Sequence, residues 1–405
     1  MGRFYRILLG TTAFATAAIA GPALAACSVE GPGVSCVMTG LDNPRGLAFG
    51  LHGALFVAEA GRGGAATGPC TVAGFNCFGN TGAVSRYWNG VQDRVASGLP
   101  SIAFTQGASA RGPHTLAIRN PRARKGSVIG EGGAHLTVGL EKDASVRNTP
   151  ARRDFAKLFH LPASTLYAPT GALCASNCWA PVVDVGGFQP AGNLDPNRET
   201  DPYGLIADEP GVVLTDASRN WLIAVDDDGT MTKLAAFPSR FDGRSTDSVP
   251  TSVTQGPDGA YYVGELVGIP FPTSPARPPA NVYRVDADTL EVSILATGFN
   301  AIIDLKFYGS ALYVLQHWTN ETAGGDGRLL RLRCTGRPIQ CDATPEVLLT
   351  NLDRATAFLI KDGALYMSLH GSSPAFQSGV YAPQGEVIRM ELGDEPQDEG
   401  TETTL

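Results

Sequence analysis

The chain has 405 residues, of which 17% are charged, and a formal net charge of −8 at pH 7. This acidic balance, with no basic cluster beyond the short run Arg122–Lys125, excludes the electrostatic footprint of a nucleic-acid-binding protein. Gly and Pro are abundant, with 49 and 28 residues. Such a composition favours short strands joined by tight turns over long helices.

The first residues have the pattern of an export signal. Arg3 and Arg6 precede an apolar run over Ile7–Ile19, and small residues follow at Ala23 and Ala25. A positive start, an apolar stretch and a small-residue cleavage site predict that residues 1–25 are removed on export. No later stretch reaches the roughly 20 apolar residues of a membrane helix. We therefore expect a soluble periplasmic or secreted protein without a transmembrane segment.

The eight cysteines fall into close pairs, which in an exported chain predict small loop-closing disulfides. The predicted pairs are Cys27 with Cys36, Cys70 with Cys77, Cys174 with Cys178, and Cys334 with Cys341. The run ending at Cys27 also fits a lipobox, but lipid anchoring there would leave Cys36 as an odd thiol, which is uncommon outside the cell. A structural zinc site lacks the CxxC pair that would support it.

A strand, a tight turn and a second strand recur along the chain. The copies are 46–59, 113–139, 203–216, 255–265, 308–314 and 361–367. A closing strand that ends in a large apolar residue recurs as well, at 37–41, 95–99, 184–188, 233–237, 295–299 and 348–352. A third strand lies between the two kinds, as at 82–87, 281–285 and 385–390. Four strands per unit, repeated about every 50 residues, are typical of propeller blades.

This order of strands predicts an all-β fold, a six-bladed β-propeller of four-stranded antiparallel blades over residues 26–392. The first closing strand precedes the first blade, so we expect the N-terminal strand to complete the last blade and leave no sheet edge unpaired. A β-sandwich would not predict two strand types in strict alternation. Residues 393–405 are acidic and are expected to form a disordered tail.

Two stretches interrupt the repeat, at about 61–80 and 141–181, and each holds a cysteine pair. Insertions in propellers map to surface loops, which often belong to the binding face. The alternative is a decorated loop that a disulfide protects from proteolysis, and the sequence leaves both interpretations open.

The turns before the innermost strands should gather on one axial face. Arg45, His114, Tyr203 and Asp304 lie in or just after these turns, and we predict that they share a binding site there. The alternative is that Arg45 and Asp304 pair across the ring, since buried polar groups usually satisfy one another.

The second strands end in a further polar set, which holds Glu59, Asp216 and Glu265, then Gln316, with His317 and His370 one position beyond. Carboxylates around a ring can bind Ca²⁺ or another divalent metal, and histidines would favour a softer ion. No contiguous ligand motif supports either set. Carboxylates at strand ends also bond neighbouring backbone, which is the competing interpretation.

Several segments resemble the ScyD/ScyE family of exported proteins, which is similar to NHL and SMP-30-type propellers. They are residues 40–49, 80–86, 112–114, 201–205 and 248–266, and the resemblance covers nearly the whole mature chain. The resemblance implies a six-bladed fold and an extracytoplasmic location. It implies no reaction, because the molecular activity of the family is not established.

Three functions remain open, and with them the question whether the protein is an enzyme. The first is binding of a small molecule or protein at the axial face, by a monomer. The second is an SMP-30-like, metal-dependent hydrolysis of lactones or esters, in which a divalent ion polarises a carbonyl. The third is a quinone-dependent sugar dehydrogenase, for which His114 and Arg45 would serve as base and cation. The sequence contains neither a GxSxG elbow nor a phosphate-binding GxxxxGK[ST] loop.

Overall fold

The computed structural model describes residues 27–28, 33–64, 68, 70–72, 74–119, 127–130, 132–175, 177–190, 199–208, 210–241, 245–268, 278–319 and 326–392. The predicted export signal 1–25, the basic run 122–125 and the predicted tail 393–405 lie outside these residues. Within them no helix is both long and apolar enough to cross a membrane.

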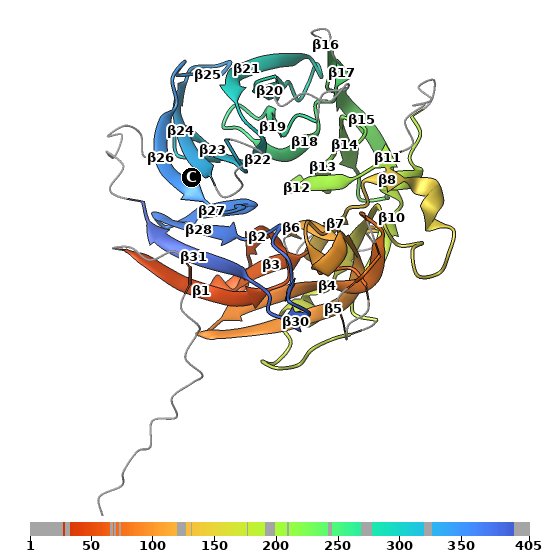
Figure 1. The fold of residues 1–405 in the computed structure, drawn as a ribbon. Helices are drawn as coiled ribbons and strands as arrows, with labels where there is room; N and C mark the ends of the chain where they lie inside the picture. The colour runs from red at the N-terminus through yellow and green to blue at the C-terminus, as the bar shows by residue number, and fades with distance from the viewer. Residues whose placement is uncertain are drawn as a thin grey trace, which may run out of the picture.

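The described strands form six antiparallel blades around an axis (Figure 1), which confirms the predicted fold. From the inside outward, the first three blades are β2 (Pro44–Phe49), β3 (Leu55–Glu59), β4 (Cys77–Trp88) and β5 (Val91–Ala103); β6 (Pro113–Arg119), β7 (Gly133–Val138), β9 (Lys157–Leu161) and β10 (Ala180–Val183); and β12 (Pro202–Asp208), β13 (Gly211–Asp216), β14 (Trp221–Val225) and β15 (Met231–Ala236).

The other three blades follow in chain order. They are β18 (Pro250–Gln255), β19 (Tyr261–Glu265), β20 (Ala280–Val285) and β21 (Val292–Phe299); β22 (Ile302–Tyr308), β23 (Ala311–Gln316), β24 (Gly327–Thr335) and β26 (Glu346–Leu352), with β25 (Gln340–Cys341) also on β24; and β27 (Ala357–Lys361), β28 (Ala364–Leu369), β31 (Gly385–Glu391) and β1 (Val34–Leu41).

Short elements connect the blades. Three two-stranded ribbons are β8 (Lys142–Asp143) with β11 (Glu199–Thr200), β16 (Arg240–Phe241) with β17 (Ser245–Thr246), and β29 (Phe376–Gln377) with β30 (Val380–Tyr381). The described helices are all short: η1 (Leu51–Gly53), η2 (Thr105–Gly107), η3 (Ala144–Arg147), α1 (Ala163–Leu166) and η4 (Val185–Gly187).

The ring is closed by strands from opposite ends of the chain. β1 pairs with β31 from Val34 opposite Met390 to Leu41 opposite Gly385, and the two lie side by side in Figure 1. The first strand of each blade contacts that of the next, and β27 contacts β2. The predicted closure by the N-terminal strand is therefore confirmed, and it satisfies backbone groups that an open sheet edge would expose.

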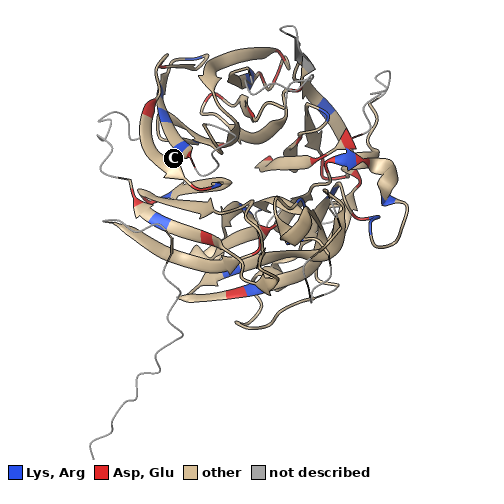
Figure 2. Ribbon diagram, in the orientation of Figure 1, with Lys and Arg blue, Asp and Glu red and all other residues tan. Residues whose placement is uncertain are grey.

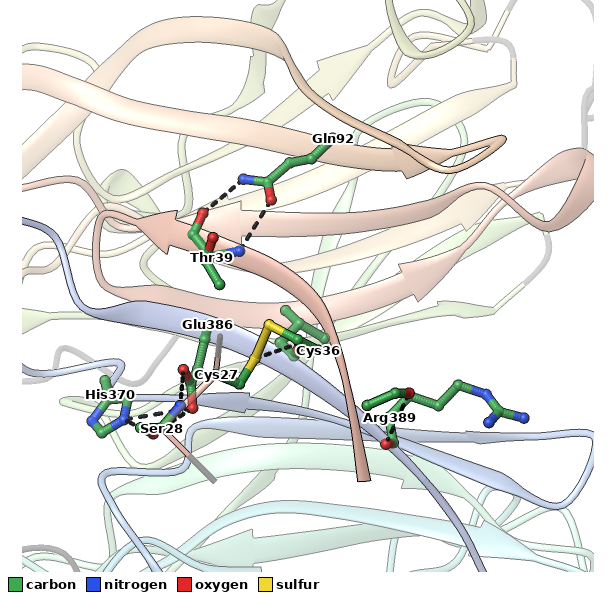
Figure 3. Close-up of a disulfide and its surroundings, with 10 residues drawn as sticks. Cys27, Ser28, Cys36, Thr39, Gln92, His370, Glu386 and Arg389 are labelled. Carbon is green, nitrogen blue, oxygen red and sulfur yellow. Dashed lines mark hydrogen bonds and ion pairs between the residues drawn. A yellow bond between two sulfur atoms is a disulfide. The ribbon is translucent and has the colours of Figure 1, made fainter. Parts of the chain in front are cut away.

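The N-terminal arm is fixed to the last blade (Figure 3). The Ser28 amide donates to Glu386 Oε2 at 2.9 Å, and Ser28 Oγ donates to Glu386 Oε1 at 2.6 Å. A disulfide joins Cys27 to Cys36 of β1. On the other side, Gln92 of β5 bonds the Thr39 backbone twice, at 3.0 and 2.8 Å, and so joins β1 to the first blade. The sulfur of Cys27 is thus bonded to that of Cys36, as the cysteine spacing predicts.

All four predicted disulfides are present, and no described cysteine is free. They are consistent with an exported protein. Charged residues of both signs are scattered over the ring (Figure 2). Between blades the core is apolar, as where Phe56 and Val84 of the first blade pack with Leu136 and Phe159 of the second.

The second blade departs from the sequence expectation. Residues 184–188 were expected to form its closing strand, but Val185–Gly187 form the 3-10 helix η4, and β10 just before them closes the blade. The Asp184 side chain accepts from the Gly187 amide at 3.1 Å, which caps this helical turn. The stretch 141–181 also supplies β9 as the third strand of the blade, so only part of it lies outside the sheet.

Part of this stretch packs on the outer side of the ring. The carbonyl of Cys174 accepts from the Ser97 amide of β5 at 2.9 Å, and Trp179 Nε1 donates to the Ser97 carbonyl at 3.1 Å. The Cys174–Cys178 loop therefore lies against the outermost strand of the first blade rather than at the axis.

Candidate functional site

An axial pocket of about 310 Å³ lies where the turns leading into the first strands meet the ends of the second strands. Each blade contributes to its lining, for example through Arg45, Arg111, Tyr203, Thr251, Ile303 and Ser372. Convergent side chains from several elements around a cavity are typical of small-molecule sites.

A repeated register places side chains in this pocket. In the first four blades the first strand begins with proline, which lacks the amide hydrogen and is tolerated at the start of a strand. Each of these prolines pairs with the last residue of the second strand, and a bulge follows. They are Pro44, Pro113, Pro202 and Pro250. The residue after the proline comes next to the axis, as Arg45, Tyr203 and Thr251 do in the pocket.

Two of the four residues predicted for the axial site line the pocket, namely Arg45 and Tyr203. His114 lies behind Tyr203, fully buried, with the ring centroids 4.2 Å apart. Asp304 comes one residue after the position at the axis, which Ile303 occupies, and it accepts from Lys306 Nζ at 2.5 Å and from the Phe358 amide at 3.1 Å. The alternative, a pairing of Arg45 with Asp304 across the ring, does not form.

Arg45 is a buried cation without an ion pair. Arg45 is 4% exposed, and its Nη2 donates to the Ala110 carbonyl at 2.7 Å. The buried Nε has no hydrogen-bond partner, and no carboxylate lies within ion-pair distance of Arg45 among the described residues. Burial lowers the pKa of Arg45 from its ordinary value. An unpaired buried charge is costly, and proteins keep such groups chiefly at functional sites.

The acidic residues of the pocket lie mainly at its mouth. Glu141, Glu199 and Asp247 are exposed, and Glu141 is paired with Arg111 at 2.6 Å. Asp201 lies deeper and accepts from the Leu140 amide at 2.8 Å. Burial, with the Glu141 carboxylate nearby, raises the pKa of Asp201 well above its usual range. The pocket thus has exposed acids at its mouth and, deeper in its lining, the buried Arg45 and Asp201.

The same environment keeps His114 neutral. Burial, reinforced by the cations Arg45 and Arg111, holds the pKa of His114 well below its usual value. Its Nδ1 lies 3.2 Å from the Pro202 carbonyl, and its Nε2 has no hydrogen-bond partner within the described part of the chain. His114 supports Tyr203 from behind and does not reach the pocket.

His317 is the histidine that lines the pocket. Its Nδ1 lies 2.6 Å from the Ala355 carbonyl. Because a carbonyl only accepts, Nδ1 carries the hydrogen, and the neutral ring presents Nε2 as an acceptor. Burial lowers the pKa of His317 to about 4, with further lowering by Arg45, Arg111 and Arg354. The sequence placed His317 among candidate metal ligands, whereas its geometry makes it a hydrogen-bond acceptor.

The pKa of His317 predicts a pH dependence of stability. The unfolded histidine titrates near 6.5 and the folded one near 4, so the unfolded state takes up the proton first as pH falls. We expect this group to cost on the order of 3 kcal/mol of stability between pH 6.5 and 4. Urea unfolding at several pH values measures this loss. In His317→Gln the free energy of unfolding should fall less between pH 6.5 and 4 than it does in the parent. An identical slope in parent and variant would contradict the assignment.

The three carboxylates predicted to hold a metal lie in three different blades, and each is engaged within its own blade. Glu59 accepts from the Asp42 amide at 2.7 Å, from Ser85 Oγ at 2.5 Å and from Arg94 at 2.6 and 2.9 Å. Asp216 accepts from Thr200 Oγ1 at 2.7 Å and the Asp201 amide at 2.8 Å.

Glu265 follows the same pattern. It accepts from Ser248 Oγ at 2.6 Å, the Asn281 amide at 2.7 Å and Tyr283 at 3.1 Å. These carboxylates join the end of the second strand to adjacent turns and strands. Across the part of the chain that the structure describes, no group of three or more His, Cys, Asp or Glu side chains is arranged to hold a metal ion.

Residues of the pocket lining that the prediction did not select include Arg111, Asp201 and Trp318. Arg111 and Asp201 belong to the same proline-containing turns that led to His114 and Tyr203, so position relative to the proline could have found them. Trp318 follows His317 and packs against it, with ring centroids 4.6 Å apart. No repeat marks Trp318 in the sequence.

No protein-family model and no curated protein matches the chain. Solved structures with a similar course of the chain include a putative oxidoreductase (glucose dehydrogenase) from Thermus thermophilus, at 16% identity over 88% of this chain and 99% of that one, with a TM-score of 0.49. A PQQ-bound aldose sugar dehydrogenase from Streptomyces coelicolor is 11% identical over 88% and 97%, with a TM-score of 0.48.

Virginiamycin B lyase from Staphylococcus aureus is a further similar structure, at 11% identity over 87% of this chain and 95% of that one, with a TM-score of 0.43. At these identities and TM-scores we draw no functional conclusion from any of the three. The assignment of the fold rests on the strand topology, and membership of the ScyD/ScyE family stays a prediction.

Proposed function

We propose that this protein is an exported binding propeller of the ScyD/ScyE type that holds a small molecule in its axial pocket. The observation that carries the proposal is the unpaired, buried Arg45 at the floor of a cavity to which all six blades contribute. A protein partner would meet the exposed acidic mouth but would leave this buried cation uncompensated, so a molecule that enters the cavity is favoured.

The residues that the sequence assigned to the two enzymatic alternatives do not come together as those reactions require. A metal-dependent hydrolase requires a cation site, but Glu59, Asp216 and Glu265 are separated and already bonded. For a quinone-dependent dehydrogenase, His114 and Arg45 would have to face the cofactor together, and His114 is buried behind Tyr203. The residues do not fit either group as the sequence suggested.

Filling part of the cavity should weaken binding. Leu266 contributes to the apolar part of the lining, and Leu266→Trp would occupy part of the volume. We expect calorimetric titration with hits from a thermal-shift screen of small metabolites to give one-to-one binding to the parent and at least tenfold weaker binding to this variant.

The control is Val347→Trp, because Val347 is 50% exposed on the outer strand β26. It should bind as the parent does. Hits that bind equally well to both tryptophan variants would place their site outside the axial pocket and refute the proposal.

A further inference from the structure

The guanidinium of Arg45 is held in place before any ligand arrives. Nη2 donates to the Ala110 carbonyl, which orients one edge of the group toward the turn before the second blade. The backbone on either side is fixed by the last blade, since Ser368 Oγ donates to the Arg45 carbonyl at 2.9 Å and Thr356 Oγ1 to the Pro44 carbonyl at 2.7 Å. Preorganisation of this kind lowers the cost of binding.

Arg45 forms no ion pair with the described residues, although the carboxylates of Asp201 and Glu141 lie near enough to favour its charge. Other buried arginines of this chain are compensated, as Arg86 is by Asp93 at 2.7 Å and by the carbonyls of Leu166 and Ala168. A planar guanidinium with free donors matches a carboxylate, which it can bind with two parallel hydrogen bonds. The exposed acids Glu141, Glu199 and Asp247 at the mouth disfavour ligands of higher negative charge, such as phosphate esters.

His317 and the aromatic side chains of the pocket indicate what the rest of the ligand contains. Nε2 of His317 has no hydrogen-bond partner among the described residues, and the neutral ring can accept a hydrogen bond there. The pocket is also lined by Trp318 and Tyr203, whose faces suit an aromatic ring or the apolar face of a sugar. A hydroxyl group on the ligand would satisfy His317.

We propose that the axial pocket binds a small hydroxylated monocarboxylate, an aromatic hydroxy acid or a sugar acid, with its carboxylate on Arg45 and a hydroxyl group on His317. This inference rests on the proposed function and names the ligand class of the same pocket.

The first test requires no ligand. If Arg45 serves to bind a ligand carboxylate, Arg45→Met removes a buried charge that has no ion pair, and the melting temperature should rise by about 2 °C. The matched control is Arg86→Met, at a residue 1% exposed whose charge is paired, and its melting temperature should fall by several degrees. A fall in Arg45→Met comparable to that in Arg86→Met would show that Arg45 is structural and would overturn the inference.

The second test compares matched probes by calorimetry. Mandelate is paired with mandelamide, and gluconate with glucitol, while phenylacetate supplies a carboxylate without a hydroxyl group. We expect at least one hydroxy acid to bind tenfold or more tightly than its neutral partner, and Arg45→Met to remove that preference. His317→Gln should weaken the hydroxy acid and leave phenylacetate unchanged.

The outcomes separate this inference from the proposed function. In one outcome, neutral probes bind as tightly as the acids, with binding lost in Leu266→Trp and kept in Arg45→Met. That result would keep the pocket as the binding site but would refute the inference that its ligand carries a carboxylate. Glucose 6-phosphate binding more tightly than gluconate would refute the monocarboxylate in favour of a phosphate ester. Even where no probe binds, the melting temperature of Arg45→Met tests whether Arg45 serves to bind an anion or to stabilise the fold.

Discussion

Met38→Asp should lower the free energy of unfolding by about 4 kcal/mol or more, enough to unfold a large part of the protein at 25 °C. Met38 is fully buried in β1, where it packs with Leu47, Leu55 and Val387 from the first and last blades. A carboxylate there has no partner, and its burial opposes the one pairing that closes the ring. Urea unfolding followed by circular dichroism measures the loss.

The control lies in the same strand. Ser35 is exposed in β1 opposite Arg389, so Ser35→Asp should change the free energy of unfolding by less than about 0.5 kcal/mol. If Met38→Asp were as stable as Ser35→Asp, closure by the N-terminal strand would contribute little to the stability of the ring.

Glu59→Gln should destabilise the protein by about 3 to 5 kcal/mol, and calcium should have no effect on that loss. Arg94 and Asp42 lie with Glu59 in one network: Arg94 is bonded to both carboxylates, and Arg62 and Tyr381 also reach Asp42. The amide substitution removes one negative charge from this network and leaves Arg94 less compensated. Burial, together with the Glu59 carboxylate, raises the pKa of Asp42. Loss of the Glu59 charge therefore also relieves some repulsion at Asp42, which offsets part of the destabilisation.

Thermal unfolding with and without added calcium tests both halves of this expectation. Glu346→Gln is the control, because Glu346 pairs with Arg331 but is 52% exposed, and it should cost less than about 1 kcal/mol. A parent protein that calcium stabilises and a Glu59→Gln variant that it does not would restore Glu59 as a metal ligand.

The fold was accessible from the sequence because a propeller repeats local signals. Each blade presents a short apolar strand, a glycine turn and an alternating strand, so errors in one copy are corrected by the others. The second blade shows the limit. Its closing strand was expected at 184–188, but Asp184 bonds Gly187 and favours a helical turn, and a side-chain contact of this kind is not visible in a hydrophobic pattern.

The site was harder to predict from the sequence, because a shift of one residue in strand register changes which side chain faces the axis. In the fifth blade Ile302 takes the place of the proline, and a bulge follows it, so Ile303 lies at the axis and Asp304 does not. Asp304 was selected from the sequence because it is polar, but the strand register places Ile303 at the axis instead. His114 shows the reverse case, since it has the right position in its turn but is covered by Tyr203.

The carboxylates at the ends of the second strands illustrate a different limit. Glu59, Asp216 and Glu265 recur at equivalent positions. Such a pattern is expected both for metal ligands arranged in a ring and for a hydrogen bond to the backbone that is repeated in each blade. Only the partners distinguish the two. They are amides and hydroxyls and, for Glu59, also the Arg94 guanidinium. Repetition in a propeller therefore indicates equivalent positions, not a shared site.

We expect the Arg45 guanidinium to bind the carboxylate of a ligand in the axial pocket. A crystal structure of the protein grown with the tightest-binding hydroxy acid tests it most directly. We expect the carboxylate oxygens within hydrogen-bonding distance of the Arg45 guanidinium and a ligand hydroxyl at His317 Nε2. A ligand bound outside the pocket, or bound within it with its carboxylate turned away from Arg45, would contradict the account.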